Sequence, residues 1–444
     1  MRRPVFNPAM HAKRKLLGTF LSAFLISWNV SAQESTQRVF TQDIDNFWVA
    51  FDSIQAANDS FHQIQLIKTI YIDKGSEGLK AFMQLRSYSA EKWVQLINRS
   101  PKFWASVRPN TLTTKEKAPM IEASIRRFKE LYPQLSDAKM YFTVGALSSG
   151  GTTTRNLILI GSEIATATKN TDVSDLPEGT SKWLGDVFKD QSLDNIIAVN
   201  IHEYVHTQQR GNPKNLLGHS IKEGSCDFIT ELVMGQPMQN NYIQYGRLHE
   251  KDLAEKFKVE MYTTQFGNWL YNGSRAKTMA DLGYYMGYAI CKSYYNNASD
   301  KKNAIKEIIE LNYSDSTAVE NFLSASKFYT ETLNKAALRA QFEVLRPRVV
   351  SIEPLKKEDS TVIADAVELK IVFSTRMDGG VSIIKGKETY PIIGLGGFSD
   401  DKTSYTLKVK LEPGNVYEFV MTDFGFKSAT GYPLKPYRVR FRTQ

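Results

Sequence analysis

The sequence lacks several features that would place it in common classes of protein. No run of basic residues is interleaved with aromatic ones, which argues against nucleic-acid binding. Its most apolar run, from Leu16 to Trp28, is too short to be a comfortable membrane span. Only two cysteines are present, Cys226 and Cys291. Both lie in apolar helical patterns typical of buried free thiols, although an exported chain would also permit a disulfide between them.

The first 32 residues are typical of an export signal. Basic residues precede the apolar run, and Val30-Ser31-Ala32 places small residues before Gln33, the expected first residue of the mature chain. No cysteine stands directly after the run, which argues against lipoprotein attachment. The segment carries five of the 56 Lys and Arg residues and none of the 47 Asp and Glu residues, so the remaining chain has a net charge of about +4. We therefore expect an exported protein, periplasmic or secreted, with no stable membrane span in the mature chain.

The mature chain begins with a helical part. Short amphipathic patterns run from about residue 40 to 135, with Phe47, Trp48, Phe51 and Ile54 forming one apolar stripe. Two β-rich runs then follow, Met140–Val144 and Asn156–Ile160, joined by a polar link rich in serine, glycine and threonine. Further helical patterns continue to residue 345. These patterns predict a mostly helical domain at 33–345, with a helical N-terminal part at about 40–135 and a second part at about 136–345 that contains a small sheet.

The last hundred residues have a different period. Beyond Arg346-Pro347-Arg348 the helical period stops, and short alternating runs separated by Gly and Pro turns begin. This pattern predicts an all-β sandwich at 346–444. The expected fold class of the whole chain is therefore α+β.

The most informative stretch is the HExxH motif His202-Glu203-Tyr204-Val205-His206. Ser192 can cap a helix here, and apolar residues recur at i, i+4 and i+8 as Ile197, Ile201 and Val205. On a helix, two imidazoles four residues apart can ligate one metal ion, while Glu203 points at the open side of that ion. With only six histidines in the chain, the motif arises by chance at odds of roughly one in a hundred or lower. The stretch therefore indicates a zinc site.

A third metal ligand is expected from the next predicted helix, Ser220 to Val233. Glu223 follows His206 by 17 positions, a distance that lets a helix-loop-helix return its carboxylate to the metal. His219 in the loop and Glu231 farther along the helix are the alternative third ligands.

Further residues are expected to support this centre. Asp227 lies one turn beyond Glu223 and is placed to accept the outer N–H of a ligating histidine, which would fix the tautomer of that ring. A zinc hydrolase also needs a donor to the oxyanion that forms at a carbonyl. Tyr285 and Tyr288 are the candidates, because Gly283 and Gly287 would let their helix approach the active-site helices closely; a plain core role for both is the alternative.

The polar link before the second β-rich run contains Gly150 and Gly151. In metallopeptidases a strand edge beside the zinc can pair with an extended substrate backbone, and these glycines would permit close approach. An ordinary hairpin connection is the alternative.

Two resemblances to known families add to this interpretation. His202-Glu203-x-x-His206 followed by Glu223-Gly224-x-x-Asp227 resembles the gluzincin branch of zinc metallopeptidases, in which two histidines and a glutamate from the next helix hold zinc. With Asp281–Tyr288, the motif is similar to a bacterial family of predicted Zn-dependent proteases. It is more distantly similar to gliding-motility lipoproteins that lack the metal motif. The resemblance spans roughly residues 40 to 340 and implies a zincin-like catalytic domain.

The C-terminal part resembles a bacterial Ig-like domain of the S-layer SbsA type. The resemblance rests on Ser351–Pro354, Val372–Asp378, Leu411–Tyr417, Ala429–Leu434 and Phe441–Thr443. Such modules are usually spacers or binding appendages, which implies contacts with cell-surface or protein partners.

Together these observations predict an exported zinc metallopeptidase that acts on a peptide or protein substrate. His202, His206 and Glu223 would hold Zn²⁺, and Glu203 would be the general base towards a zinc-activated water. One alternative is a surface or periplasmic binding or assembly protein with a structural or vestigial metal site, although such a site has no need for Glu203. A zinc hydrolase with a non-peptide substrate is the other.

Overall fold

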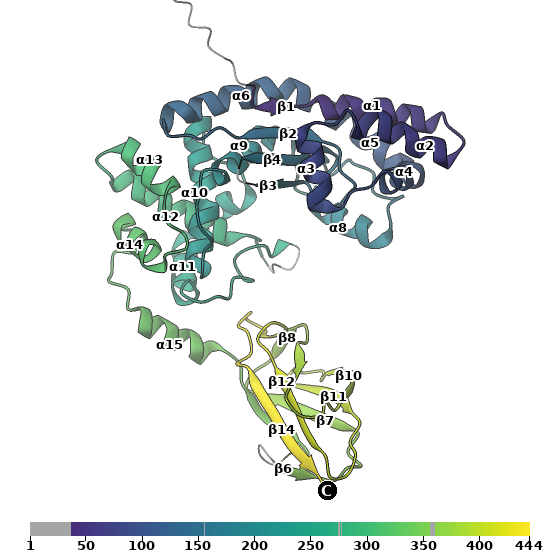
Figure 1. The fold of residues 1–444 in the computed structure, drawn as a ribbon. Helices are drawn as coiled ribbons and strands as arrows, with labels where there is room; N and C mark the ends of the chain where they lie inside the picture. Colours follow the sequence, from purple (N-terminus) through teal and green to yellow (C-terminus); the bar gives the residue numbers. More distant parts are fainter. Residues whose placement is uncertain (1–36, 155, 274–275, 277, 356–359) are drawn as a thin grey trace, which may run out of the picture. The chain divides into compact units, whose positions relative to one another are not determined.

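The computed structural model describes residues 37–154, 156–273, 276, 278–355 and 360–444. The predicted export signal, residues 1–32, lies outside them. None of the helices in the described part of the chain is long and apolar enough to cross a membrane. Figure 1 shows helices with a small sheet in the first three quarters of the chain and strands alone near its end. The predicted α+β class is confirmed.

The N-terminal helices form as the apolar stripes predict. Phe47, Trp48 and Ile54 are buried on the first helix, and Phe51 packs against the same core. The buried Tyr71 hydroxyl donates to the carbonyl of Val144 at 2.7 Å, which ties these helices to the segment after the second strand. The elements are α1 (Gln42–Gln55), α2 (Ser60–Leu66), the π-helix η1 (Ile67–Ile72), α3 (Glu77–Arg86), α4 (Ala90–Arg99), α5 (Pro101–Leu112) and α6 (Thr114–Leu131).

A four-stranded sheet lies beside these helices, in the order β1-β2-β4-β3. Its strands are β1 (Val39–Phe40), β2 (Lys139–Thr143), β3 (Gly151–Thr153) and β4 (Leu157–Gly161). β1, β2 and β4 are parallel, whereas β3 runs antiparallel to β4 and forms the edge. The two β-rich runs were predicted, but part of the polar link is also a strand. Thr152 and Thr153 pair with Leu159 and Ile158, a non-local contact that the sequence pattern does not reveal.

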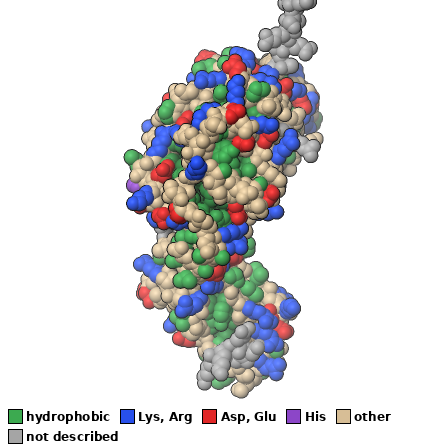
Figure 2. Space-filling view, turned by 90° about the vertical axis from the view of Figure 1, so that its left-hand side faces the viewer, with side chains coloured by type: hydrophobic (Ala, Val, Ile, Leu, Met, Phe, Trp, Pro, Cys, Tyr) green, Lys and Arg blue, Asp and Glu red, His purple; other side chains and the backbone are tan. Residues whose placement is uncertain are grey.

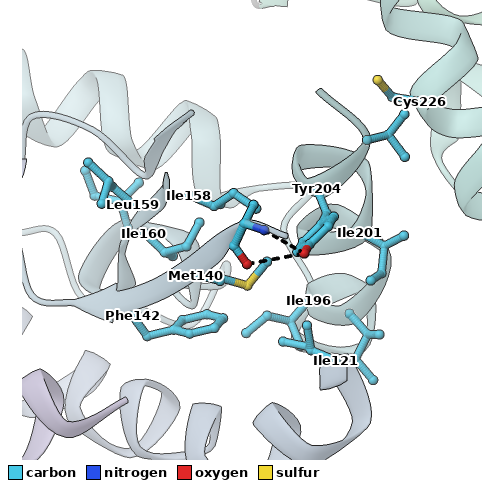
Figure 3. Close-up of a cluster of buried hydrophobic side chains, with 14 of the residues drawn as sticks. Ile121, Met140, Phe142, Ile158, Leu159, Ile160, Ile196, Ile201, Tyr204 and Cys226 are labelled. Carbon is cyan, nitrogen blue, oxygen red and sulfur yellow. Dashed lines mark hydrogen bonds between the residues drawn. The ribbon is translucent and has the colours of Figure 1, made fainter. Parts of the chain in front are cut away.

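The HExxH helix packs on this sheet. The connecting elements are α7 (Ser162–Ala165), α8 (Glu178–Phe188), the 3₁₀ helix η2 (Leu193–Asn195) and α9 (Ile196–His206). Figure 3 shows Tyr204 of α9 beside Met140 of β2 and Ile158 of β4, and Ile196 of α9 beside Phe142 of β2. The Tyr204 hydroxyl also donates to the carbonyl of Ala138 at 3.2 Å and accepts from its N–H at 2.9 Å. One face of α9 is therefore fixed to the sheet, which leaves another face free to present polar groups.

The remaining helices complete this part of the chain. They are α10 (Leu216–Met234), α11 (Asn241–Glu260), α12 (Leu282–Asn297), α13 (Lys301–Ile309), α14 (Ser316–Ser326) and α15 (Lys335–Leu345). α10 and α12 approach very closely at two glycines. A Cβ on Gly287 would lie 1.7 Å from the Ser220 carbonyl oxygen, and one on Gly224 would lie 2.0 Å from the Tyr288 nitrogen. The predicted close approach of the Gly287 helix is therefore confirmed.

This crossing makes Gly287 a sensitive position. Because the added methyl group would meet backbone rather than a flexible side chain, we expect Gly287→Ala to lower the free energy of unfolding by about 3 kcal/mol. Urea unfolding of the mature chain would measure it. The matched control is Gly179→Ala in α8, where no atom lies within 4 Å of the added Cβ and a small stabilisation is expected. If Gly287→Ala lowered the free energy of unfolding by less than about 1 kcal/mol, the close packing of α12 on α10 at this glycine would be contradicted.

The C-terminal part is built from strands alone. One sheet has the order β10-β11-β7-β5 and the other β6-β14-β12-β9, with β8 and β13 as a separate pair. The strands are β5 (Val349–Glu353), β6 (Ser360–Val362), β7 (Glu368–Phe373), β8 (Met377–Gly379), β9 (Ile383–Lys385), β10 (Ile392–Phe398), β11 (Ser404–Val409), β12 (Val416–Met421), β13 (Phe426–Ser428) and β14 (Tyr437–Thr443). Both four-stranded sheets contribute to one apolar core, distinct from the core of the helical part. The domain boundaries at residues 32 and 345 and the Ig-like assignment stay predictions.

Candidate metal centre

Helices α9 and α10 bring His202, His206 and Glu223 together. Oε2 of Glu223 lies 3.1 Å from Nε2 of His206 and 3.6 Å from Nε2 of His202. Ligand atoms in a tetrahedral zinc site with bonds of about 2.0–2.1 Å are about 3.3 Å apart. The two measured separations bracket that spacing, so two neutral imidazole nitrogens and one carboxylate oxygen fit a single zinc ion.

The three groups also influence one another's ionisation. Burial alone would raise the pKa of Glu223, but hydrogen bonds from both histidines hold that pKa well below its usual range. Burial would lower the pKa of His202, but the carboxylates of Asp227 and Glu223 outweigh it and raise that pKa well above its usual value. The Glu223 carboxylate is therefore ionised, as a ligand must be, and a metal would compete with protons for the imidazoles.

Cys226 offers a different donor set, since its sulfur and the two histidines provide atoms within 4.8 Å of one another. Its sulfur, however, lies 3.4 Å from Nδ1 of His206, the ring nitrogen that does not face Glu223. Burial also raises the pKa of the Cys226 thiol to about 11, which favours the protonated form. Because zinc binds the thiolate, Glu223 fits the third position better than Cys226 does. Both cysteines are buried and free, so they do not form a disulfide.

The outer nitrogens of both imidazoles have hydrogen-bond partners. Nδ1 of His202 lies 2.8 Å from Oδ1 of Asp227, whose other oxygen accepts from the Tyr242 hydroxyl at 2.9 Å. This is the contact expected of Asp227, and it directs Nε2 of His202 towards Glu223. Nδ1 of His206 lies 2.8 Å from Oε1 of Gln209. Sequence reasoning missed Gln209, although a polar residue three positions after a ligating histidine is a usable signal.

Glu203 lies next to the edge of the sheet. The Thr153 hydroxyl on β3 donates to Oε2 of Glu203 at 2.7 Å. Glu203 and His202 line a cavity of about 180 Å³. Thr153 is a second residue that the sequence did not reveal, because its place depends on the pairing of β3 with β4.

The tyrosines beside the centre are not the predicted ones. Tyr285 donates to Glu250 at 2.5 Å and Tyr288 donates to Glu231 at 2.7 Å, and both line a separate cavity of about 580 Å³. The structure therefore does not bring these two hydroxyls to the histidine pair. One residue turns a helix by about 100°, so a neighbouring position faces a different direction.

Tyr271 and Tyr284 lie at the centre instead. The Tyr271 hydroxyl donates to Oε1 of Glu223 at 2.9 Å, and the Tyr284 ring stacks on His202 with centroids 6.2 Å apart. Tyr271 thus holds the Glu223 oxygen that does not face the histidines.

The two alternative third ligands have other partners. The His219 ring packs on Phe266 with centroids 5.1 Å apart. Glu231 accepts from Tyr288 and from the Lys292 ammonium, the latter at 2.9 Å. Among His219, Glu223 and Glu231, Glu223 is the one with an oxygen at ligand-like distances from both histidines.

This geometry defines a class of protein in which two histidines and a glutamate are placed to hold zinc. A further glutamate, here Glu203, lies beside them. A family described as "Predicted Zn-dependent protease (DUF2268)" matches residues 183–316, the segment that contains this whole set. No curated protein matches the chain.

Several solved structures show weak likeness to the chain. CopC from Methylosinus trichosporium OB3b is 19% identical, with 22% of this chain and 94% of that chain covered and a TM-score of 0.18. The S-layer protein rSbsC(31-844) is 14% identical, with 60% and 37% covered and a TM-score of 0.17. Likenesses at these TM-scores support no inference about function.

Proposed function

We propose that this chain is an exported zinc metallopeptidase, with His202, His206 and Glu223 as ligands and Glu203 as general base. The observation that carries the proposal is the approach of Glu223 Oε2 to both Nε2 atoms at ligand-like separations. Support comes from the position of Glu203, one residue after His202, and from the match of this segment to a family of predicted Zn-dependent proteases. Export itself rests on the predicted signal at residues 1–32.

The reaction follows from the placement of the chain's own groups. When bound, zinc supplies a Lewis acid that polarises a carbonyl and makes a water acidic near neutral pH. The Thr153 hydroxyl donates a hydrogen bond to Oε2 of Glu203. The other carboxylate oxygen, Oε1, is then left to take a proton from the attacking water. Glu203 then delivers that proton to the leaving amine. Tyr271 and Asp227 keep Glu223 and His202 oriented throughout.

The edge strand β3 would bind the substrate backbone by pairing with it. This strand pairs with β4 on one side and is the last strand of its sheet. Because Thr153 connects β3 to Glu203, a peptide added to this edge would pass close to the general base. Backbone pairing of this kind binds extended peptides with little regard to sequence.

Metal removal tests the proposal. We expect mature protein with one zinc per chain to cleave members of a mixed peptide library, and 1,10-phenanthroline to abolish cleavage until zinc is restored. Mass spectrometry would record the products and elemental analysis the zinc. The non-chelating isomer 1,7-phenanthroline is the matched control.

Two results would contradict the proposal. Cleavage that survives complete removal of zinc would refute the role of the metal. Stoichiometric zinc without cleavage of any library member would favour the binding or assembly protein, or a hydrolase with a non-peptide substrate.

A further inference from the structure

The two sides of the candidate metal centre differ in charge. On the His206 side, an open cleft of about 760 Å³ is lined by Arg210 and Lys222 together with His206, Glu223 and Thr153. The cavity on the His202 side, of about 180 Å³, has no basic residue among the residues that line it other than His202 itself. Apart from the centre's own groups, its walls are uncharged side chains such as Val199, Met238 and Tyr284.

Neither cation in the larger cleft forms an ion pair with a carboxylate of the described residues. Arg210 is exposed, and its guanidinium has no hydrogen-bond or ion-pair partner among the residues that the structure describes. Lys222 is half-buried, and its ammonium donates to the Gly211 carbonyl at 3.1 Å and lies 6.0 Å from the centroid of the Tyr313 ring. Figure 2 shows positive and negative side chains interspersed on one face of the protein.

Among the residues that line this cleft, Glu223 carries the carboxylate, and that carboxylate is engaged at the metal centre. Glu223 accepts from Tyr271 through Oε1 and faces the imidazoles through Oε2. Glu310 accepts from the Tyr132 hydroxyl at 2.7 Å and forms no ion pair with Arg210. The cleft therefore offers two cationic donors, one of them a planar guanidinium that matches a carboxylate with two hydrogen bonds.

We infer, building on the proposed function, that the His206 side of the cleft binds a carboxylate of the peptide substrate. The carboxylate belongs either to an acidic side chain or to a free C-terminus, and Arg210 and Lys222 are the specificity-determining residues. The cavity on the His202 side, whose walls beyond the centre's own groups are uncharged, accepts a neutral side chain on the other side of the scissile bond. The substrate class is thus a peptide with negative charge on one defined side of the cleaved bond.

Binding of three peptide pools would test this inference. All are random nonapeptides without Asp or Glu elsewhere: the first has a free C-terminal acid, the second a C-terminal amide, and the third an amide with one Glu scanned through the sequence. Their binding to zinc-loaded Glu203→Gln protein would be compared by equilibrium dialysis and mass spectrometry. We expect the first or the third pool to bind about tenfold more tightly than the second at low salt, and added salt to reduce that ratio. The pool that binds more tightly shows whether the carboxylate belongs to the C-terminus or to an acidic side chain.

Variants connect the preference to the two cations. In the double variant Arg210→Ala, Lys222→Ala, the ratio of the affinities for the carboxylate-bearing and amide pools should fall to about one. The control is the double variant Arg126→Ala, Lys256→Ala, at exposed positions elsewhere, which should leave this ratio unchanged. Arg210→Glu alone should reverse the preference towards peptides with Lys in place of Glu. Zinc content and unfolding curves would confirm that each variant is folded.

The outcomes separate this inference from the proposed function. Equal binding of the three pools, or a preference that persists in the double variant, would overturn the inference. Wild-type protein that cleaves all pools equally would overturn it while the peptidase proposal stands. A binding preference that depends on Arg210 and Lys222, without cleavage of any pool, would support the inference and refute the peptidase.

Discussion

Replacing Glu203 by glutamine is expected to leave zinc bound and to lower kcat/KM for peptide cleavage by about 10²–10⁴-fold. Glutamine has nearly the same shape, and its amide oxygen can still accept from the Thr153 hydroxyl, which now bonds Oε2 of Glu203 at 2.7 Å. The side chain therefore keeps its place but can no longer take a proton from water. Because the three proposed ligands are unchanged, zinc content should stay at one per chain.

The measurement combines elemental analysis with cleavage of one library-derived peptide, for wild type and variant at equal zinc content. Glu130→Gln is the matched control, since Glu130 is an exposed helical glutamate on α6 and its substitution should change neither zinc nor rate. A Glu203→Gln variant with more than about a tenth of wild-type activity would exclude Glu203 as the general base. A variant that loses zinc as well would instead assign Glu203 a role in holding the ligands.

The core of the candidate centre could be predicted because helical geometry acts over short distances. His202 and His206 lie one turn apart on α9, and the apolar positions of that helix determine which of its faces packs on the sheet. The connection from α9 to α10, residues 207–215, leads directly into the helix that carries Glu223, which limits how far that carboxylate can lie from the histidines. Asp227 follows from Glu223 by one further turn, which is why the contact with His202 was foreseen.

Residues that depend on tertiary packing could not be predicted in the same way. The sequence Tyr284-Tyr285 offers two adjacent tyrosines, and only the crossing of α12 over α10 at Gly224 and Gly287 decides which of them faces His202. Tyr271 lies outside regular secondary structure with a φ of 54°, so no periodicity indicates its direction. Contacts of this kind depend on the whole core and not on the local pattern.

In the C-terminal part, too, the local pattern predicted some elements, whereas others depend on tertiary packing. The alternating runs beyond residue 348 predicted strands in this part, and the longer strands β7, β11, β12 and β14 form there. The short strands β6, β8, β9 and β13 have three residues each, too few to show alternation. Their pairing is decided by neighbours distant in sequence, such as the parallel contact of β6 with β14.

The second large expected effect concerns the third zinc ligand, for which Glu223 and Cys226 are the two candidates. The two candidates predict opposite effects of substitution on zinc affinity. We expect Glu223→Ala to weaken zinc binding by about 3–4 kcal/mol, or two to three orders of magnitude in Kd, because one of three protein ligands is lost. Cys226→Ser should change the Kd by less than about tenfold. The reason is geometric: Glu223 Oε2 faces Nε2 of both rings, whereas the Cys226 sulfur contacts Nδ1 of His206.

Zinc affinity would be measured by competition with a chromophoric chelator at fixed pH, since protons compete for both imidazoles. Cys291→Ser is the matched control for Cys226→Ser, because both thiols are buried and Cys291 is not among the residues grouped at the histidine pair. Cobalt substitution adds an independent readout, since thiolate ligation gives an intense sulfur-to-metal charge-transfer band and a His-His-Glu set does not. Loss of zinc in Cys226→Ser with retention in Glu223→Ala would replace the carboxylate by the thiolate as third ligand. That result would also argue against the resemblance to gluzincins, because Glu223 would then not bind the metal.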